Sequence, residues 1–496
     1  MTESAIIRIT PEDSVGTTLR AVAVGETLSV GDATLIAAEA VPAGHKIALR
    51  SIRSGDPVIK FGFPIGTASS AISAGAHVHS HNLATALAGT QGYRYMPDPF
   101  PLTKRDQPQR NFEGYLRADG RAATRNEIWV LPTVGCVART AEKIAASAHA
   151  RHRGTVDGVY AFKHPFGCSQ LGDDLGATRT VLAGLASNPN AAGVLIVGLG
   201  CESNQTSALL ETIAPEIRRN IRVLGAQQAG DEVADGVALV DALVASASFA
   251  RRTTIALDKL VIGVKCGGSD GYSGLTANPL VGRISDAVTD AGGTAILTEI
   301  PEIFGAEELL MRRAADEHVF DATVALVNSF KRYFIGHGEP VSENPSPGNI
   351  AGGITTLEEK SLGAVQKAGH ARVTDVRLYG ERVRHPGLTL LEAPGNDAVS
   401  STALAAAGAT LILFTTGRGT PLGFPVPTIK IASNSELAAR KPGWIDFDAG
   451  SALTHGFNAA TDALLDVVLA TASGTPTAAE RNDEREIALW KRGVTL

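Results

Sequence analysis

The sequence has few cysteines, few aromatic residues and no long apolar run. Of its 496 residues, 4 are cysteine and 5% are aromatic. So few thiols in so long a chain exclude a disulfide-stapled secreted fold, and we expect reduced cysteines and a cytoplasmic location. The longest apolar stretches, 191–199 and 409–414, are far shorter than the roughly 20 residues that a membrane-spanning helix needs. We therefore expect no membrane segment.

The chain also lacks an excess of basic charge and the common nucleotide-binding fingerprints. It carries 45 Lys and Arg against 51 Asp and Glu, a net charge of −6 with no block of either sign, so nucleic acid is not an expected partner. The turns VGCVAR at 134–139 and VGLGCESN at 197–204 lack the third glycine of a dinucleotide turn, and no GxxxxGK[ST] occurs. Nicotinamide and ATP are therefore disfavoured as cofactors.

The residues that are present divide the chain into a small β region and longer α/β regions. Residues 1–95 hold short β-type runs, such as 18–24, between Gly, Pro and Asp turns. Residues 96–111 contain four prolines and no apolar periodicity, which predicts an extended linker. Over 112–250 and 251–496, strand-like runs alternate with helical patterns, which is typical of parallel sheets covered by helices. The expected fold is a multi-domain α/β protein with one small N-terminal β domain.

All four cysteines follow predicted strands. Cys136, Cys168, Cys201 and Cys266 each adjoin a glycine at the end of an apolar run, spaced by about one, one and two strand–helix units. Parallel strands place their carboxyl ends at one edge of a sheet, where ligands bind and where thiols can meet a soft metal. The alternative is that cysteine is simply a small residue suited to a tight turn, and no CxxC spacing favours a closed zinc site.

Two segments carry candidate acid, base or ligand groups. In GAHVHSHN, His77, His79 and His81 occupy every second position, so on a strand their imidazoles share one face. That face can hold a carboxylate, a proton or a metal, or it can be a solvated strand face. In KHPFGC, Lys163 and His164 stand at a predicted strand end, where they offer acid and base chemistry.

A glycine-rich turn and a pair of acids mark the later α/β region. KCGGSDGYSG, residues 265–274, places four glycines around Asp270 after an apolar run, so its backbone amides can approach an anion closely. Glu299 and Glu302 flank a proline after the next apolar run, where carboxylates suit a divalent ion or proton abstraction. Both segments predict ligand-binding turns.

Further polar groups stand in predicted loops. Residues 343–363 are too rich in Gly, Pro and Asn for regular structure, and they hold Asn349 and Lys360; loops of that length in compact domains are often functional. Asp397 follows an asparagine, and either residue can cap the helix that begins there. Arg418 lies between glycines after a predicted strand, which suits a bidentate clamp on a carboxylate.

Twelve ordered blocks give the chain a resemblance to the altronate and galactarate dehydratase family along nearly its whole length. They include HVHSHN, FGCSQLGDD, CGGSDGYSGLTANPLVGR, TEIPEIFGAE, NPSPGNIAGGITTLEEKSLGAVQKAG and FTTGRGTP. The resemblance implies an N-terminal β-clip domain of the SAF type, a middle domain that makes homodimer contacts and a C-terminal Rossmann-like domain with a metal site. It also implies a ferrous-iron hydro-lyase acting on a linear sugar acid, with D-altronate giving 2-dehydro-3-deoxy-D-gluconate and galactarate as the alternative substrate.

On this resemblance we assign roles as hypotheses. A base must remove the proton beside the carboxylate, a divalent ion must stabilise the enediolate, and an acid must protonate the departing 3-hydroxyl. The expected metal ligands are Cys266, Asp270, Glu299 and Asp397. The expected catalytic groups are Lys163, His164 and Cys168. The expected substrate contacts are Arg418, Lys360, Asn349, His77 and His79. We expect the histidine face to close over the site as a mobile lid.

Three alternatives remain open. Manganese or another divalent ion can take the place of iron, and three of the cysteines can instead hold an iron–sulfur cluster that acts as a Lewis acid. The protein can also be a sugar-acid binder without catalytic activity. A keto-acid assay, together with an analysis of iron and acid-labile sulfide, distinguishes these alternatives.

Overall fold

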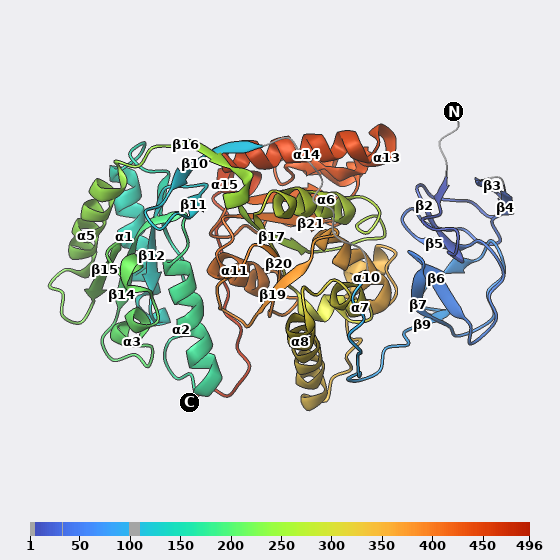
Figure 1. The fold of residues 1–496 in the computed structure, drawn as a ribbon, viewed down its shortest axis with the longest axis horizontal. Helices are drawn as coiled ribbons and strands as arrows, with labels where there is room; N and C mark the ends of the chain where they lie inside the picture. Colours follow the sequence, from blue (N-terminus) through green and yellow to red (C-terminus); the bar gives the residue numbers. More distant parts are fainter. Residues whose placement is uncertain (1–4, 32, 99–109) are drawn as a thin grey trace.

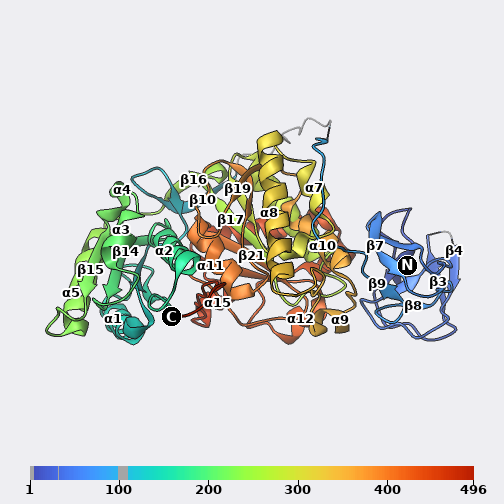
Figure 2. The same ribbon diagram turned by 90° about the horizontal axis from the view of Figure 1, so that it is seen from below.

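The structure consists of three bodies arranged in a row. It is a computed structural model, and it describes residues 5–31, 33–98 and 110–496. Figure 1 shows the N-terminal β region at one end, the middle α/β region at the other and the C-terminal region between them, and Figure 2 shows the same order from below. Most of the predicted proline-rich linker lies outside the described residues. The order in space therefore differs from the order along the chain.

The N-terminal region is built from short antiparallel strands. One sheet has the order β1-β2-β5-β8, a second has the order β6-β7-β9, and β3 pairs with β4. The strands are β1 (Ile6–Ile7), β2 (Val15–Thr18), β3 (Thr27–Val30), β4 (Ala33–Ile36), β5 (Lys46–Ala48), β6 (Pro57–Lys60), β7 (Phe63–Ala68), β8 (His77–Val78) and β9 (Leu83–Ala84). The prediction of a strand over 18–24 is wrong. Strand β2 ends at Thr18, where the chain bends, and within 19–24 the structure has one isolated bridge, between Val22 and Val41.

The middle region is a four-stranded parallel sheet with helices on both faces. Its strand order is β13-β12-β14-β15. The strands are β12 (Glu127–Pro132), β13 (Gly158–Ala161), β14 (Ala191–Gly198) and β15 (Ile221–Gly225), and the main helices are α1 (Ala138–Arg151), α2 (Gly172–Ala186) and α5 (Glu232–Ala247). Helices α1 and α5 share one apolar core with the sheet, because their Ala, Val, Leu and Ile residues recur at helical spacing. Helix α2 packs toward the C-terminal region (Figure 1).

The C-terminal region is a seven-stranded parallel sheet in the order β19-β20-β18-β17-β21-β22-β23. The strands are β17 (Val261–Cys266), β18 (Thr294–Leu297), β19 (Val373–Arg377), β20 (Gly387–Leu391), β21 (Leu411–Thr416), β22 (Thr428–Ala432) and β23 (Phe447–Asp448). The main helices are α6 (Ala277–Asp290), α8 (Glu317–Gly336), α11 (Asp397–Ala407) and α14 (Phe457–Ala472). A separate antiparallel sheet, β11-β10-β16, consists of β10 (Asn111–Leu116), β11 (Ala122–Ala123) and β16 (Thr253–Ala256).

Strand β17 occupies a special position in this sheet. The chain passes from β17 to β18 on one side, and it returns much later to β21 on the other side. The loops that leave the carboxyl ends of β17 and β21 therefore diverge. Such a topological switch point is the usual place for a ligand site in an open parallel sheet.

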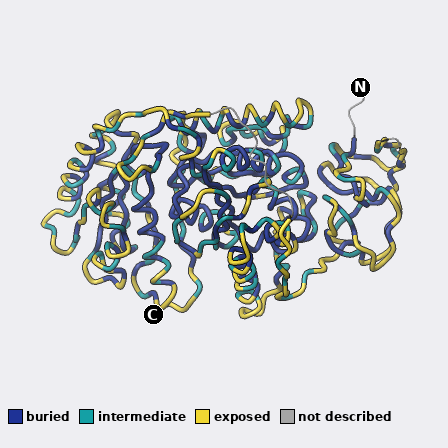
Figure 3. The backbone as a smooth tube through the Cα atoms, viewed as in Figure 1, coloured by how far each residue is buried: buried dark blue, intermediate teal, exposed yellow. Residues whose placement is uncertain are grey.

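The predicted fold class is confirmed, since small antiparallel sheets precede two parallel sheets with helices. Figure 3 shows the backbone through both parallel sheets as largely buried, with exposed residues on the outer helices and loops. In the described part of the chain, no helix combines the length and the apolar character needed to span a bilayer. The domain limits 1–95, 96–111, 112–250 and 251–496 remain predictions.

The last residues of the chain lie against the middle region. Asp174 of α2 accepts hydrogen bonds of 2.8 Å from the backbone amides of Arg492 and Gly493. Thr495 forms an antiparallel bridge with Gln170. The two α/β regions are thus joined by this tail as well as by the packing of α2 on α11.

Candidate active site

Two glycines let the end of β17 approach its neighbours. Cys266 is the last residue of β17, and Gly267 and Gly268 follow. A Cβ on Gly267 would lie 2.6 Å from Oδ2 of Asp397 and 2.6 Å from Cζ of Phe414, so a larger residue would force these side chains to move. Gly268 has φ +62°, in the left-handed region that favours glycine, and it lies against Arg418. The glycines therefore bring the strand end to the switch point without steric conflict.

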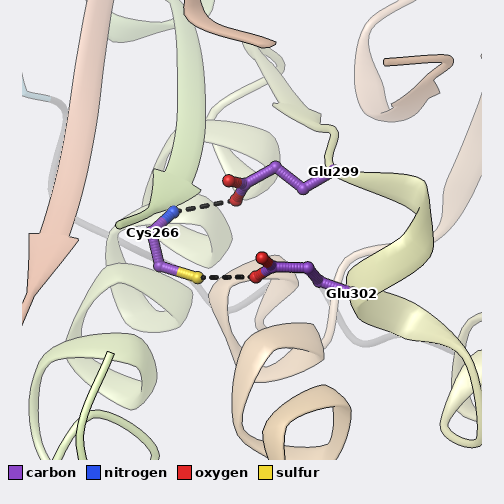
Figure 4. Close-up of side chains that lie close together, drawn as sticks. All are labelled: Cys266, Glu299 and Glu302. Atoms are coloured by element: carbon purple, nitrogen blue, oxygen red, sulfur yellow. Dashed lines mark hydrogen bonds between the residues drawn. The ribbon is translucent and has the colours of Figure 1, made fainter. Parts of the chain in front are cut away.

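Cys266, Glu299 and Glu302 form a buried cluster at this edge (Figure 4). The backbone amide of Cys266 donates a hydrogen bond of 2.9 Å to Oε2 of Glu299, and the thiol donates one of 3.4 Å to Oε2 of Glu302. One possible ligand atom from each residue lies within 4.8 Å of the other two. Glu299 follows β18 with φ 64°, a left-handed conformation for a residue with a side chain. This turn directs both glutamates toward Cys266.

Three buried lysines pair with the acids of this cluster. Nζ of Lys367 lies 2.8 Å from Sγ of Cys266, and Nζ of Lys360 lies 2.8 Å from Glu302. Nζ of Lys265 lies 3.1 Å from Glu299 and 2.6 Å from Asp397. A buried charge without a partner is very costly, so this arrangement depends on the pairing of cations with carboxylates. The ammonium groups of the three lysines match the carboxylates of the two glutamates and the aspartate.

These contacts set the protonation of the cluster. Burial raises the pKa of the Cys266 thiol to about 12, although Lys367 opposes this change. Burial lowers the pKa of Lys367, but Cys266 and Glu299 raise it by a larger amount. The net pKa therefore lies above the usual range. Burial raises the pKa of Glu299, while Lys265 and Lys367 lower it, and the net pKa is lowered. At neutral pH the cluster therefore contains a protonated thiol, an ionised Glu299 and a charged Lys367.

A cavity of about 560 Å³ opens beside the glycine loop, between the N-terminal and C-terminal regions. Its lining includes Asp270, Tyr272 and Arg418 from one region, and Leu19 and Ala43 from the other. Arg418 is exposed, and its guanidinium has no hydrogen-bond or ion-pair partner among the described residues. The cavity therefore presents an unpaired cation to any carboxylate that enters it.

Asp270 lines the cavity but is tied to the protein. Its carboxylate accepts hydrogen bonds from the hydroxyls of Ser273 at 2.9 Å and Ser433 at 2.8 Å, and from Nδ2 of Asn434 at 2.9 Å. Burial raises the pKa of Asp270, and these hydrogen bonds offset only part of that effect. Asp270 thus holds the glycine loop in place, and it lies outside the group of converging ligand atoms.

The segment 343–363 is more regular than predicted. It holds two short helices, α9 (Pro347–Ala351) and α10 (Leu357–Ala364). They form because Ser346 and Asn349 make a capping box and Thr356 accepts the amide hydrogen bond that caps α10. Asn349 donates a hydrogen bond of 2.8 Å to the carbonyl oxygen of Ser269, and its Oδ1 accepts one of 3.2 Å from Lys360. Both predicted substrate contacts on this segment therefore lie beside the cluster.

The predicted histidine face lies at the junction with the C-terminal region. His45 Nδ1 lies 3.1 Å from His77 Nε2, and the rings of His45 and His79 stack with centroids 5.1 Å apart. His79 Nε2 donates a hydrogen bond of 3.0 Å to the carbonyl oxygen of Ile350. Burial lowers the pKa of all three imidazoles, to about 4 for His77. At neutral pH these three imidazoles are therefore uncharged.

A buried ion triad joins the same two regions. Lys46 and Lys60 of the N-terminal region each place Nζ 2.8 Å from an oxygen of Glu359 in α10. Burial lowers the pKa of Lys46 to about 8, and Glu359 opposes that change. Burial raises the pKa of Glu359, but the two lysines outweigh burial and hold that pKa far below its usual range. The N-terminal region is thus docked next to the helix that carries Lys360.

The predicted catalytic residues lie in the middle region instead. Lys163 is exposed and pairs with Glu142 at 3.1 Å. His164 is buried, donates from Nε2 to the carbonyl oxygen of Pro132 at 2.9 Å and accepts from the amide of Phe166 at 3.2 Å. Cys168 is exposed. Within one chain the middle region flanks the side of the C-terminal region opposite the N-terminal one (Figure 1).

The structure therefore brings only part of the predicted site together. Cys266 and Glu299 converge, Asp397 is linked to them through a lysine, and Asp270 stands apart. Glu302 is not among the predicted ligands, although its place three residues after Glu299 is a signal for it. The sequence holds no local signal for Lys367, which meets a thiol 101 residues away along the chain.

Comparison with known proteins agrees with this architecture. Residues 4–86 match the altronate/galactarate dehydratase SAF domain, residues 114–248 match the second domain of D-galactarate dehydratase/altronate hydrolase, and residues 257–495 match the C-terminal domain of D-galactarate/altronate dehydratase. These matches together span nearly the whole described chain.

Curated relatives match over similar lengths. The chain is 49% identical to altronate dehydratase of Escherichia coli (strain K12), over 99% of each chain. It is 48% identical to altronate dehydratase of Bacillus subtilis (strain 168), over 99% of this chain and 100% of the relative. It is 33% identical to galactarate dehydratase (L-threo-forming) of Escherichia coli (strain K12), over 84% of this chain and 82% of the relative. The chain belongs to the altronate and galactarate dehydratase family.

Proposed function

We propose that this chain is an altronate dehydratase, a hydro-lyase that converts D-altronate to 2-dehydro-3-deoxy-D-gluconate and water. Identity of 49% and 48% to two altronate dehydratases, against 33% to a galactarate dehydratase, supports D-altronate as the substrate. The observation that carries the reaction type is the buried Cys266, Glu299 and Glu302 cluster at the switch point, next to a cavity with an unpaired guanidinium.

We propose that this cluster holds a divalent transition metal, with ferrous iron first and manganese second. One thiol and two carboxylates suit such an ion better than magnesium or calcium, which take oxygen ligands. The buried position and the convergence within 4.8 Å fit a single ion. When bound, the ion would stabilise the negative charge that develops as the proton beside the carboxylate is removed. Cys266 would hold the ion as a thiolate, and its thiol proton would leave to solvent.

The residues of the chain divide the remaining tasks. Arg418 binds the substrate carboxylate, because its guanidinium is exposed in the cavity and unpaired among the described residues. Lys360 protonates the departing 3-hydroxyl. Burial lowers the pKa of Lys360, but Glu302 and Cys266 raise it by a larger amount, so the ammonium form persists at neutral pH. Asn349 positions Lys360 through its Oδ1. His77 and His79 do not line this cavity, and their neutral imidazoles would bind substrate hydroxyls only when the junction between the two regions closes over the substrate.

The predicted roles of Lys163, His164 and Cys168 require a second copy of the chain. In one chain these residues lie in the middle region, and none of them lines the cavity of Arg418. A homodimer that places the middle region of one copy over the cavity of the other would supply them. We propose such a dimer, and sedimentation of the purified protein measures its stoichiometry.

The test is a keto-acid assay under anaerobic conditions. The protein is loaded with ferrous iron, manganese or no metal, and is offered D-altronate, galactarate and other aldonic acids. We expect the highest kcat/KM for D-altronate with iron and little product without metal. Glu302→Gln should lower bound iron and turnover together, whereas Glu308→Gln, at a glutamate on the neighbouring helix, should change neither. Preference for another sugar acid, or binding of altronate without product, would refute the proposal.

A further inference from the structure

Three of the four cysteines are exposed on the middle region, and the proposed metal site uses none of them. Cys136, Cys168 and Cys201 follow β12, β13 and β14. These strands are neighbours in the sheet order β13-β12-β14 and run parallel. All three thiols therefore leave the same carboxyl edge of one sheet, the edge at which open parallel sheets bind ligands.

The strand register places two of these thiols at equivalent positions. Pro132 of β12 pairs with Val197 of β14. Cys136 and Cys201 each follow four residues later. Since neighbouring strands lie about 4.8 Å apart, the two cysteines start from adjacent points on the edge.

Close backbone contacts join the loops that carry the three thiols. The amide of Gly135 donates a hydrogen bond of 2.9 Å to the carbonyl oxygen of Phe166. Gly135 directly precedes Cys136, and Phe166 lies two residues before Cys168. A Cβ on Gly167 would lie 2.1 Å from the carbonyl oxygen of Thr133. Gly167 in turn accepts a hydrogen bond of 2.9 Å from the amide of Asn204, three residues after Cys201. The three loops therefore form one packed surface.

A buried donor without a partner lies in the Cys168 turn. Gln170 is 4% exposed, and its Oε1 accepts a hydrogen bond of 3.0 Å from the amide of Gly167. Its Nε2 is buried and has no hydrogen-bond partner among the residues that the structure describes. A buried amide hydrogen without an acceptor is costly, so the turn is built for an acceptor that the protein does not itself provide. A bound sulfide would be such an acceptor.

We infer that Cys136, Cys168 and Cys201 together bind an iron–sulfur cluster at the carboxyl edge of the middle sheet. A single ion fits these thiols less well. Among the described residues, the one group of three ligands that converge within 4.8 Å is Cys266, Glu299 and Glu302, and it contains none of these three cysteines. A cluster of iron and sulfide is larger than one ion, so its thiolate ligands stand further apart. Helices α1 and α2 begin shortly after Cys136 and Cys168, and their N-terminal amides favour an anionic ligand.

The ligand count defines the chemistry of this site. Three cysteines are fewer than the four that complete the usual protein coordination of a four-iron cluster. One iron would therefore remain open to a small oxygen-containing ligand. This inference is tested apart from the proposed dehydratase activity, because its readout is bound iron and sulfide, and it makes Cys168 a cluster ligand rather than a catalytic group.

The test is anaerobic reconstitution of the full chain with ferrous iron and sulfide, followed by desalting. Iron, acid-labile sulfide and visible charge-transfer absorption are measured for the natural chain and for Cys136→Ser, Cys168→Ser and Cys201→Ser. Cys266→Ser is the matched control, since it removes the one thiol of the C-terminal region. We expect several irons and a comparable amount of sulfide per natural chain, a loss of most sulfide in each of the three variants, and retention in the control.

Other results would overturn the inference. These are a natural chain that retains no sulfide, a variant at any of the three positions that retains it fully, and a control that loses it. Iron bound at these thiols without sulfide would also contradict a cluster. Because the three side chains are exposed, serine should preserve the fold, and far-ultraviolet circular dichroism of each variant checks this. A variant that misfolds is replaced by the corresponding alanine.

Discussion

Nζ of Lys367 lies 2.8 Å from Sγ of Cys266, and both side chains are buried in the C-terminal region. The same ammonium lies 3.4 Å from Glu299. Lys367 thus contacts two of the three residues that we propose as metal ligands. Lys367 balances their charge, which explains how a thiol and two glutamates coexist in a buried cluster.

Replacing Lys360 by methionine should reduce kcat by about a hundredfold or more, the usual contribution of a positioned general acid. Methionine keeps the length of the side chain but removes the proton and the contact with Glu302. Steady-state kinetics on D-altronate measure the effect, and iron analysis shows whether the metal is retained.

Lys163→Met tests the alternative that a second copy supplies the acid, and Lys143→Met, at another exposed lysine of the middle region, is the control. Lys163 is exposed on the middle region and pairs with Glu142. An equal loss of kcat in Lys163→Met would assign the acid to a second copy of the chain, and an unchanged kcat in Lys360→Met would remove Lys360 from the chemistry.

Replacing Arg418 by glutamine should lower kcat/KM roughly ten- to hundredfold, because hydrogen bonds to a charged group are worth about 1.5–3 kcal/mol. The melting temperature should not change, since the side chain is exposed. Arg440 lines the same cavity but is already paired with Glu436 at 3.0 Å. Arg440→Gln should therefore have a much smaller effect, and equal effects of the two substitutions would argue against a carboxylate clamp.

Replacing Glu359 by glutamine should destabilise the protein by about 3–5 kcal/mol, the usual result of removing one partner of a buried ion pair. The substitution leaves Lys46 and Lys60 buried without their carboxylate. Urea unfolding measures the change. Glu436→Gln removes a carboxylate whose side chain is 83% exposed, and it should change stability very little. Similar values for the two variants would show that the triad does not stabilise the junction.

Stability should fall as pH falls from about 6.5 toward 4, and His77 should contribute to that slope. Burial, and then the neighbouring His45, His79, His81 and Lys46, lower its pKa from 6.5 to about 4 in the folded protein. The unfolded chain therefore binds more protons in this window, which favours unfolding as the pH decreases. The melting temperature of the natural chain, followed across this window, measures the slope.

His77→Gln should flatten this dependence, because glutamine does not titrate. Glu39 also faces the segment, with Oε2 3.2 Å from the amide of His77, and it is unchanged in the variant. The control is His455→Gln at an exposed histidine, which should retain the natural slope. Parallel curves for all three proteins would contradict the role of His77.

Local patterns predicted the architecture well. Apolar runs before GGSDG and GRG placed β17 and β21, and glycines marked the turns that follow these strands, because strand and turn preferences act over a few residues. The failures were local as well. Residues 18–24 have the composition of a strand but bend after Thr18, and residues 343–363 look irregular but are held helical by Ser346, Asn349 and Thr356.

The candidate site was less predictable because its pairs form between distant segments. Cys266 meets Lys367, and Lys46 of the N-terminal region meets Glu359, which lies 313 residues later in the sequence. No periodicity links such residues, since their proximity depends on how whole sheets and domains pack. Glu302 was within reach of sequence reasoning, because its turn also carries Glu299.

The C-terminal tail has a practical consequence for experiments on this protein. The amide of Leu496 donates a hydrogen bond of 2.9 Å to the carbonyl oxygen of Ser169, beside Cys168. An affinity tag fused after Leu496 would begin at that turn and would compete with the contacts that Asp174 makes to the tail. Purification handles are therefore better placed at the opposite terminus.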